Sequence, residues 1–293
     1  MATSGRSDHD AFRRGLRRNA PTLARDLPWI RHREPWAVLV SEVMLQQTQT
    51  SRVVGPWTNF IAAFPSPTSC ADAPLSAVLR LWSGLGYHRR AKALHDASKM
   101  IRDEFDGGVP KVVADLRRLP GVGEYTANAV ASFAFGSNVA VVDTNVGRVL
   151  ARAIANRTLS ASEARILAND LLPRSDAAAF NQAMLDLGAQ FCTSTPKCAS
   201  CPVARACKWN LEGGPDPAPR SAGVSKAQSK FQGSDRQVRG RVLAALRERP
   251  RSMQHLVVCV EEVNADRTET LVEGLIADGL VERRGQLVRL CGD

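Results

Sequence analysis

Two carboxylic acids in this chain stand in largely uncharged surroundings and could do chemistry. Glu42 lies in the run 41–49, where apolar side chains precede four residues that donate and accept hydrogen bonds. Asp143 directly follows the uncharged run 138–142. Cleavage of a glycosidic bond uses two carboxylates, because one protonates the leaving group while the other supports the oxocarbenium character of the anomeric carbon. Glu42 and Asp143 are the candidate pair.

Each acid also has an explanation that needs no chemistry. Glu42 could lie on the solvated face of an amphipathic helix, which composition alone favours. Asp143 could be the N-cap of a helix that begins near Asn145. A carboxyl group packed against apolar neighbours would instead have a raised pKa, and could act as a general acid near neutral pH.

A Gly-Val-Gly hairpin between two apolar segments is the second feature. Residues 119–127 read Leu-Pro-Gly-Val-Gly-Glu-Tyr-Thr-Ala. Gly121 and Gly123 allow the backbone to take positive φ, so that successive amides around Val122 can form an anion-binding nest at the start of the next helix. Such a nest binds phosphate without reading base sequence. The alternative is an ordinary turn between antiparallel helices.

Four of the seven cysteines crowd into residues 192–207. Their spacing is Cys192-x5-Cys198-x2-Cys201-x5-Cys207, which fits a closed site of four thiolates. Spacing alone leaves zinc and an iron–sulfur cluster equally open. In a protein that we expect to be cytoplasmic, such a cluster favours metal over disulfides.

The composition is that of a globular protein, and its net charge favours a polyanionic partner. The 293 residues carry a net charge of +10, of which +9 lies in residues 1–211. A basic balance of this kind favours nucleic acid, although an arginine-rich genome could also produce it. No run approaches the length of a membrane span, and residues 1–10 lack the apolar core of a secretory signal.

The elements that must position these residues are helical. Apolar periodicity predicts helices from about residue 10 to residue 190, and no convincing alternating strand. Gly and Pro separate segments that we expect to be helical near the following residues: 11–18, 35–47, 52–63, 74–82, 89–103, 111–118, 124–135, 145–155, 161–171 and 177–190. Residues 1–9 are expected to be a disordered tail.

Beyond the cysteines the chain changes character. Residues 212–235 have the Gly, Pro, Ser and Ala content of a linker. Residues 236–293 then read as three short helices followed by a hairpin that turns at Arg284-Gly285, which predicts a small winged-helix-like domain. Its wing could contact duplex DNA through Arg283, Arg284 and Arg289, or the domain could bind another protein.

These features together resemble the helix-hairpin-helix DNA glycosylases, and specifically the adenine glycosylases of the MutY type. The resemblance covers residues 10–211. The segments that carry it are Asp-Leu-Pro-Trp at 26–29, residues 41–49, Leu-Trp-Ser-Gly-Leu-Gly-Tyr at 81–87, residues 119–127, Val-Asp-Thr-Asn-Val at 142–146, residues 180–189 and the cysteine loop. It implies an all-α fold of two lobes, one 4Fe–4S cluster on the four cysteines, and hydrolysis of adenine from duplex DNA where adenine is mispaired with 8-oxoguanine or guanine.

The resemblance also implies a role for each matched residue. Glu42 would protonate the adenine and later activate water, Asp143 would stabilise the cationic sugar, and Tyr125 and Asn145 would line the reacting centre. Other residues would contact the DNA around the flipped base: Gln47, Thr48, Leu85, Tyr87, Gly121, Val122 and Gly123. Arg25 and Trp29 would belong to the adenine pocket. The enzyme would act as a monomer, in the cytoplasm at the nucleoid, without a nucleotide cofactor or a membrane.

Position 125 separates the subclasses of this superfamily. Endonuclease III-like members have the same hairpin and cysteine loop, but carry a lysine at this position that attacks the sugar as an amine. Tyr125 cannot form a Schiff base. We therefore expect a monofunctional glycosylase that does not cut the strand efficiently.

Two departures from the family pattern affect these expectations. The spacing that follows Cys192 is one residue shorter than is usual in the family, so the resemblance supports ligation by Cys192 less strongly than ligation by the other three cysteines. Many relatives also append a larger domain that reads 8-oxoguanine, and residues 236–293 are too few for that fold. We therefore expect weaker discrimination between 8-oxoguanine and guanine than in those relatives.

Other functions remain open on the sequence. Removal of thymine or uracil from mispairs would use the same hairpin and Tyr125, and an endonuclease III-like activity the same scaffold. A non-catalytic iron–sulfur DNA-binding regulator is an alternative of another class. The acids Glu42 and Asp143 speak against a regulator, since a DNA binder gains nothing from acids near phosphates.

Overall fold

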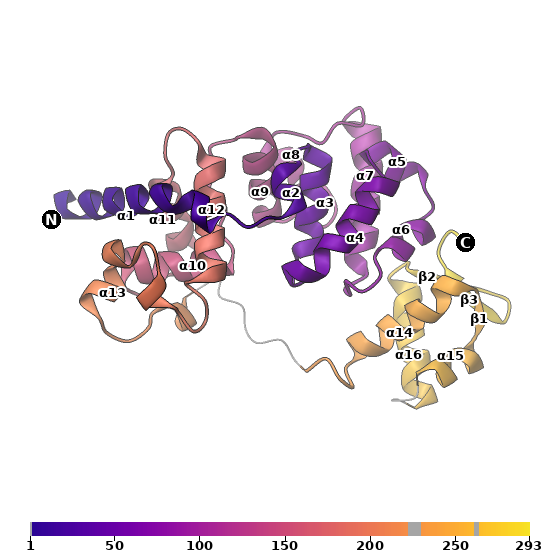
Figure 1. Cartoon of the computed structure of the whole chain (residues 1–293). Helices are drawn as coiled ribbons and strands as arrows, with labels where there is room; N and C mark the ends of the chain where they lie inside the picture. Colours follow the sequence, from indigo (N-terminus) through magenta and orange to yellow (C-terminus); the bar gives the residue numbers. More distant parts are fainter. Residues whose placement is uncertain (1, 222–229, 261–263) are drawn as a thin grey trace. The chain divides into compact units, whose positions relative to one another are not determined.

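The computed structural model describes residues 2–221, 230–260 and 264–293, and it divides into two compact units. Unit 1 combines residues 1–27 with 124–226, and unit 2 combines residues 28–123 with 227–293. Figure 1 shows the helices and strands of both units along the chain. No helix in the described part of the chain has both the length and the apolar character to cross a bilayer.

In unit 1, helix α12 (Ala177–Gln190) packs against two other helices. One is α1, Ala2–Leu23, and the other is α10, Thr144–Val149. A single apolar core joins them, with Phe12, Leu16 and Val149 fully buried. The remaining elements of this unit are α9 (Glu124–Phe135), the π-helix η1 (Leu150–Ala155), α11 (Ala161–Leu171), η2 (Cys198–Ser200), η3 (Ala204–Ala206), α13 (Lys208–Glu212) and η4 (Ala218–Arg220).

Two expectations about unit 1 were wrong. Helix α1 begins at Ala2, where a disordered tail was expected over residues 1–9. The turn anchored by buried Phe12 and Leu16 supplies the nucleus, and each further residue then adds a backbone hydrogen bond. The single helix expected over 145–155 is an α-helix that changes to a π-helix at Leu150.

Unit 2 begins with a helical part. Helix α7 (Arg89–Glu104) packs on α5 (Pro67–Asp72), and α3 (Pro35–Leu45) packs on α4 (Thr50–Ala63). The other helices here are α2 (Pro28–Arg31), α6 (Leu75–Leu81) and α8 (Val113–Leu116). Helix α3 is buried on nearly every face, since Trp36 to Met44 are all buried. That burial matters for Glu42, which lies in the last turn of the helix.

The C-terminal module groups with this helical part. It consists of α14 (Asp235–Glu248), β1 (Arg251–Ser252), α15 (Met253–Cys259), α16 (Ala265–Ala277), β2 (Val281–Arg284) and β3 (Leu287–Leu290). The three helices and the hairpin that the sequence predicts are present. Strand β3 lies between β1 and β2 in an antiparallel sheet. Strand β1 was not predicted, because two residues are too short to show alternation.

Two boundaries around this module differ from the sequence prediction. The hairpin turns at Gly285-Gln286, one residue later than expected, because Arg284 still pairs with Leu287. The expected linker 212–235 is not loose over its first part. Asp216 forms an ion pair with the buried Arg152, and Ala218 and Ser221 are buried. Residues 222–229 of that expected linker lie outside the described residues.

Candidate active site and cysteine pocket

Asp143 is the N-cap of helix α10 in unit 1. Its Oδ1 accepts a hydrogen bond from the backbone N–H of Val146 at 2.8 Å, and its Oδ2 accepts one from Asn145 Nδ2 at 2.6 Å. Burial raises the pKa of Asp143, and the hydrogen bonds from Val146 and Asn145 oppose that rise. The capping interpretation is thus confirmed, and it fixes the orientation of both carboxylate oxygens.

A chain of hydrogen bonds leads from Asp143 to the cysteine loop. Asn145 Oδ1 accepts from Arg148 Nη2 at 2.6 Å, and Arg148 Nε donates to the carbonyl of Cys192 at 2.7 Å. The same guanidinium donates to the carbonyl of Gly188 at 3.0 Å. Arg148 is not among the residues predicted for the site, although its i+3 spacing from Asn145 places both on one face of α10. Arg148 therefore links the Asp143 carboxylate to Cys192.

Gly188 explains how helices α10 and α12 come so close. A Cβ at this position would lie 2.7 Å from Asn145 Cβ and 2.7 Å from its carbonyl oxygen, closer than real contacts allow. Gly188 lies in the family-like run 180–189, but its role does not follow from the sequence. Only glycine allows Asn145 its place beside α12.

Tyr125 and Arg25 lie in the same unit as Asp143. Tyr125 is the second residue of α9 and packs, partly buried, against the core of unit 1. Arg25 Nε donates to Asp186 Oδ1 at 2.6 Å, and Asp186 is almost fully buried on α12. The Arg25 guanidinium is therefore held by α12. The assignment of Arg25 and Trp29 to an adenine pocket stays a prediction.

Glu42 lies in unit 2 and is buried. Only 5% of its surface is exposed, among the apolar residues of α3. The alternative of a glutamate on a solvated helix face is therefore wrong. Trp29, in the same unit, is buried edge-on against Trp57 with ring centroids 5.9 Å apart. The pairing of Glu42 with Asp143 of unit 1 stays a prediction.

Three of the four residues expected near the opposite base contact one arginine, Arg90, which the sequence pattern does not single out. Arg90 Nη1 donates to the carbonyls of Val43, Met44 and Gln46 at the end of α3. Arg90 Nη2 donates to Thr48 Oγ1 at 3.0 Å and to the carbonyl of Leu85 at 3.2 Å. This one side chain thus ties the segment after α3 to the loop before α7.

Tyr87 and Gln47 complete this group. Both have positive φ, +47° and +54°, which is uncommon for residues other than glycine. The Tyr87 ring lies 5.4 Å from the Arg90 guanidinium. Burial lowers the pKa of Arg90 to about 10, so it remains cationic at neutral pH. Positive charge and strained backbone therefore coincide at the segment expected to face DNA.

The hairpin is anchored within unit 2. Gly121 has φ +75°, and a Cβ there would lie 2.8 Å from the Cβ of Ala93 on α7. Its carbonyl accepts a hydrogen bond from Gln46 Nε2 at 3.3 Å, and Val122 is buried. Only Gly121 of the two hairpin glycines has positive φ, so the expectation for Gly123 was wrong. Close packing on α7 explains why the left-handed turn falls at Gly121.

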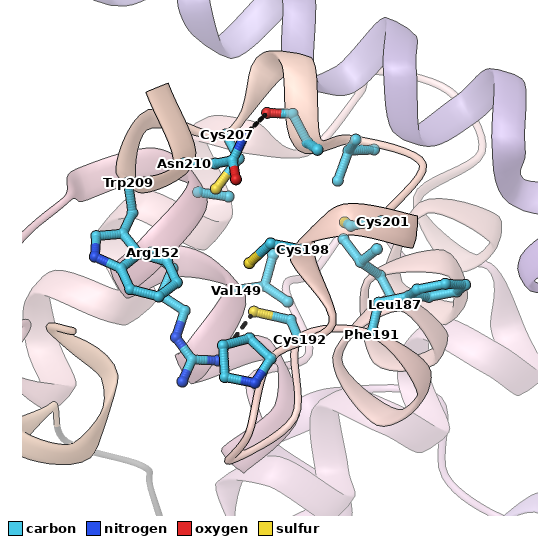
Figure 2. Close-up of a pocket in the computed structure, with 14 residues that line it drawn as sticks. Val149, Arg152, Leu187, Phe191, Cys192, Cys198, Cys201, Cys207, Trp209 and Asn210 are labelled. Carbon is cyan, nitrogen blue, oxygen red and sulfur yellow. Dashed lines mark hydrogen bonds between the residues drawn. The ribbon is translucent and has the colours of Figure 1, made fainter. Parts of the chain in front are cut away.

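The four cysteines of the loop line one pocket in unit 1, with apolar walls that include Val149 and Leu187 (Figure 2). Among the described residues, no group of three or more His, Cys, Asp or Glu side chains converges on the position of one metal ion. Burial raises the pKa of the Cys192 and Cys201 thiols, and that of Cys207 to about 11. A bound cation or cluster would favour the thiolate forms of these three side chains, against the effect of burial.

Arg152 supplies a positive charge at this pocket. It is 1% exposed on η1, and its Nη1 donates to Cys192 Sγ at 3.4 Å, the dashed line in Figure 2. Its other nitrogens hold Asp216 at 2.8 and 2.6 Å. Arg152 is not predicted from the sequence, because nothing in the pattern shows that the helix widens at Leu150. Four sulfurs, apolar walls and one guanidinium form a donor set that fits an iron–sulfur cluster.

Comparison with known proteins identifies the class of protein to which this chain belongs. Residues 40–174 match the profile of the HhH-GPD superfamily of base excision DNA repair proteins. A thermostable thymine-DNA glycosylase superimposes with a TM-score of 0.65 at 26% identity, covering 71% of this chain and 98% of that one. Endonuclease III trapped on DNA gives 0.60 at 27% identity, with coverage of 67% and 92%. The fold is that of a helix-hairpin-helix DNA glycosylase.

Relatives of similar sequence identify the family within this superfamily. The chain is 41% identical to an adenine DNA glycosylase of Mycolicibacterium smegmatis over 268 residues, 88% of each protein. It is 44% identical to one of Mycobacterium tuberculosis over 273 residues, 88% of this chain and 86% of that one. The chain therefore belongs to the adenine DNA glycosylases, which are hydrolases of the DNA N-glycosylase class.

Proposed function

We propose that this chain removes adenine mispaired with 8-oxoguanine or guanine from duplex DNA, as a monofunctional glycosylase. The observation that carries the proposal is the identity of 41% and 44% to adenine DNA glycosylases over 88% of the chain. The burial of Glu42 in an apolar helix supports it, since a solvated glutamate would be a poor general acid at neutral pH.

Glu42 and Asp143 share the chemistry in this proposal. Glu42 donates a proton to a ring nitrogen of adenine as the bond from C1′ to N9 breaks, so that adenine leaves neutral. Asp143 stays ionised and stabilises the positive charge on the sugar, with its orientation fixed by Asn145 and Val146. Glu42, now a carboxylate, takes a proton from the water that adds to C1′, and so returns to its starting state.

The DNA contacts follow from the same assignment. Amides around Gly121, Val122 and Gly123 bind a backbone phosphate. Gln47, Thr48, Leu85 and Tyr87 occupy the space left by the flipped base and contact the opposite one, and Arg90 holds the last three of them together. Flipping costs a few kcal/mol, and less at a mispair, which contributes to selectivity. Arg25 and Trp29 contact the extruded adenine.

One 4Fe–4S cluster on Cys192, Cys198, Cys201 and Cys207 belongs to the proposal. Its support is the donor set: four thiols that line one pocket and the Arg152 guanidinium beside Cys192. When bound, the cluster would hold the basic loop that carries Lys197, Arg205 and Lys208. Iron, acid-labile sulfide and zinc analysis of anaerobically purified protein tests this. Four iron and four sulfide per chain are expected, and stoichiometric zinc with no sulfide would refute the cluster.

The activity is tested with four duplexes that carry A:8-oxoG, A:G, T:G or U:G pairs. Single-turnover base release is expected from the two adenine mispairs only. Strand breaks are expected only after heat or alkali, because Tyr125 cannot form a Schiff base. Release of thymine or uracil at comparable rates would favour the mismatch-glycosylase alternative, which the structural likeness to a thymine-DNA glycosylase keeps in view. Strand cleavage as fast as base release would refute the monofunctional assignment.

A further inference from the structure

The arginines at the wing of the C-terminal module are already paired within that module. Arg283 Nη2 lies 2.6 Å from Glu273 Oε1, and Arg289 Nη2 lies 2.5 Å from Glu282 Oε1. Arg284 is 3.8 Å from the same Glu282 carboxylate. Two carboxylates thus offset two of the three arginine charges, so the wing attracts a polyanion less than its three arginines alone would.

A second group of arginines in the module lies on α14. A pocket of about 360 Å³ opens in unit 2 where α14 and α16 meet the loop before α7. Its polar lining includes Gln46, Gln47, Arg89, Arg90, Arg236 and Arg239. The module therefore contributes arginines to the segment that we propose faces the opposite base.

Arg236 reaches this segment directly. Its Nη1 donates to Tyr87 Oη at 2.6 Å, and its guanidinium carbon lies 5.4 Å from the centre of the Tyr87 ring. Arg90 lies at the same distance from that ring. Tyr87 is thus held by two guanidinium groups, one from the helical part of unit 2 and one from the C-terminal module.

The charges in this pocket do not cancel. Four arginines face one carboxylate, Asp278, and Asp278 is engaged by Arg89 at 2.6 Å. Arg90 is occupied by backbone carbonyls and contributes only its field. His88 adds no positive charge at neutral pH, because burial and the charges of Arg247 and Arg90 lower its pKa to about 4. Among the residues that line the pocket, positive charges therefore outnumber negative ones.

Arg239 is the available cation. In the described part of the chain it is paired with no carboxylate, and its buried Nε has no hydrogen-bond partner. Arg239 lines the pocket together with Arg236. A buried donor without a partner is costly, so the arrangement suits a ligand that accepts hydrogen bonds from a guanidinium.

We propose that Arg239 and Arg236 of α14 complete, with the loop before α7, a binding site for a backbone phosphate of the duplex. Guanidinium groups bind phosphate oxygens with two parallel hydrogen bonds, which matches the excess of positive charge in the pocket and the Arg239 side chain that pairs with no carboxylate among the described residues. The site shares Gln47 and Tyr87 with the proposed opposite-base contacts, so its phosphate would belong to the same bound DNA. The inference rests on the proposed function for its ligand, but not on the base that is excised.

The test is the salt dependence of duplex binding, measured by fluorescence anisotropy between 50 and 200 mM salt on an undamaged duplex. Loss of one phosphate contact lowers the slope of log K against log salt by about 0.9. For Arg239→Gln, the advantage of wild type should therefore shrink about 3.5-fold across this range. Arg239→Lys, which keeps the charge, should restore most of the slope and serves as the folding check.

Arg249→Gln is the matched control. It removes one exposed arginine from the same module outside the pocket, and its slope should equal that of wild type. The proposal is overturned if Arg239→Gln keeps the wild-type slope, or if Arg249→Gln loses as much. Because binding is measured without base release, a protein that released no adenine could still show the Arg239 effect. An active glycosylase without the Arg239 effect would refute this site alone.

Discussion

Asn145 donates a hydrogen bond to Asp143 at 2.6 Å, while the other oxygen of the same carboxylate caps helix α10. One side chain therefore has a structural and a proposed catalytic task on separate oxygens. Asp143→Asn keeps an oxygen for the cap but removes the charge. Asp143→Ala removes both. The two variants separate the tasks.

We expect both Asp143 variants to lose adenine release by at least about 100-fold, the cost of removing one electrostatic stabiliser from a transition state. Only Asp143→Ala should also lose about 1 kcal/mol of unfolding free energy, because its cap is gone. Single-turnover rates and urea denaturation measure the two effects. Wild-type turnover in Asp143→Asn would reduce this residue to a helix cap.

Glu42→Gln tests the general acid. The amide fits the same buried position in α3 but cannot give up a proton, so base release should fall by at least about 100-fold. Affinity for an A:8-oxoG duplex should stay within about twofold, since no contact with phosphate is lost. Glu34→Gln is the control, an exposed residue at the start of the same helix whose side chain makes no capping bond. Full turnover in Glu42→Gln would exclude Glu42 as the acid.

Gly188→Ala should displace Asn145 and with it the support of Asp143. Its Cβ would lie 2.7 Å from Asn145, and overpacking of this kind costs about 1–3 kcal/mol. Base release should fall together with stability. Gly55→Ala is the matched control in helix α4, where a Cβ meets nothing within 4 Å, and it should stabilise the protein by about 0.5–1 kcal/mol. An active and equally stable Gly188→Ala would show that α10 and α12 can separate without cost.

The sequence predicts the helical elements and the candidate acids well, since both depend on local pattern. Apolar periodicity places α3, α7 and α12 to within about two residues, and a carboxylate before a helix predicts the cap at Asp143. The family resemblance is confirmed by relatives along 88% of the chain.

What the sequence could not predict depends on contacts between distant segments. Arg90 and Arg148 look like ordinary helix-surface arginines until the carbonyls they bind are known. Arg152 becomes buried only because η1 widens and Asp216 returns to meet it from a segment with linker composition. Gly188 is explained by a neighbour 43 positions earlier in the chain, Asn145. The net charge of the C-terminal module likewise does not show which of its arginines already form ion pairs with carboxylates of the module.

His88 should make unit 2 sensitive to mild acid. It is buried, and its Nε2 lies 3.2 Å from Arg247 Nη2, which can only donate, so His88 must be neutral to accept. Its pKa falls from 6.5 to about 4 on folding, so the unfolded chain binds a proton that the folded chain refuses. The contribution of neutral His88 to the free energy of unfolding is complete above pH 6.5 and is lost as the pH falls toward 4.

Between pH 7 and pH 5 the loss should be about 2 kcal/mol, which urea denaturation at each pH can measure. His88→Gln can still accept from Arg247 through its amide oxygen, and should lose this part of the pH dependence. His95, whose pKa burial also lowers, is present in both proteins and cancels in the comparison. His255→Gln, at an exposed position of the same unit, should keep the wild-type profile. If wild type and His88→Gln lost equal stability over this range, His88 would have to be protonated in the folded protein, and its hydrogen bond from Arg247 could not exist.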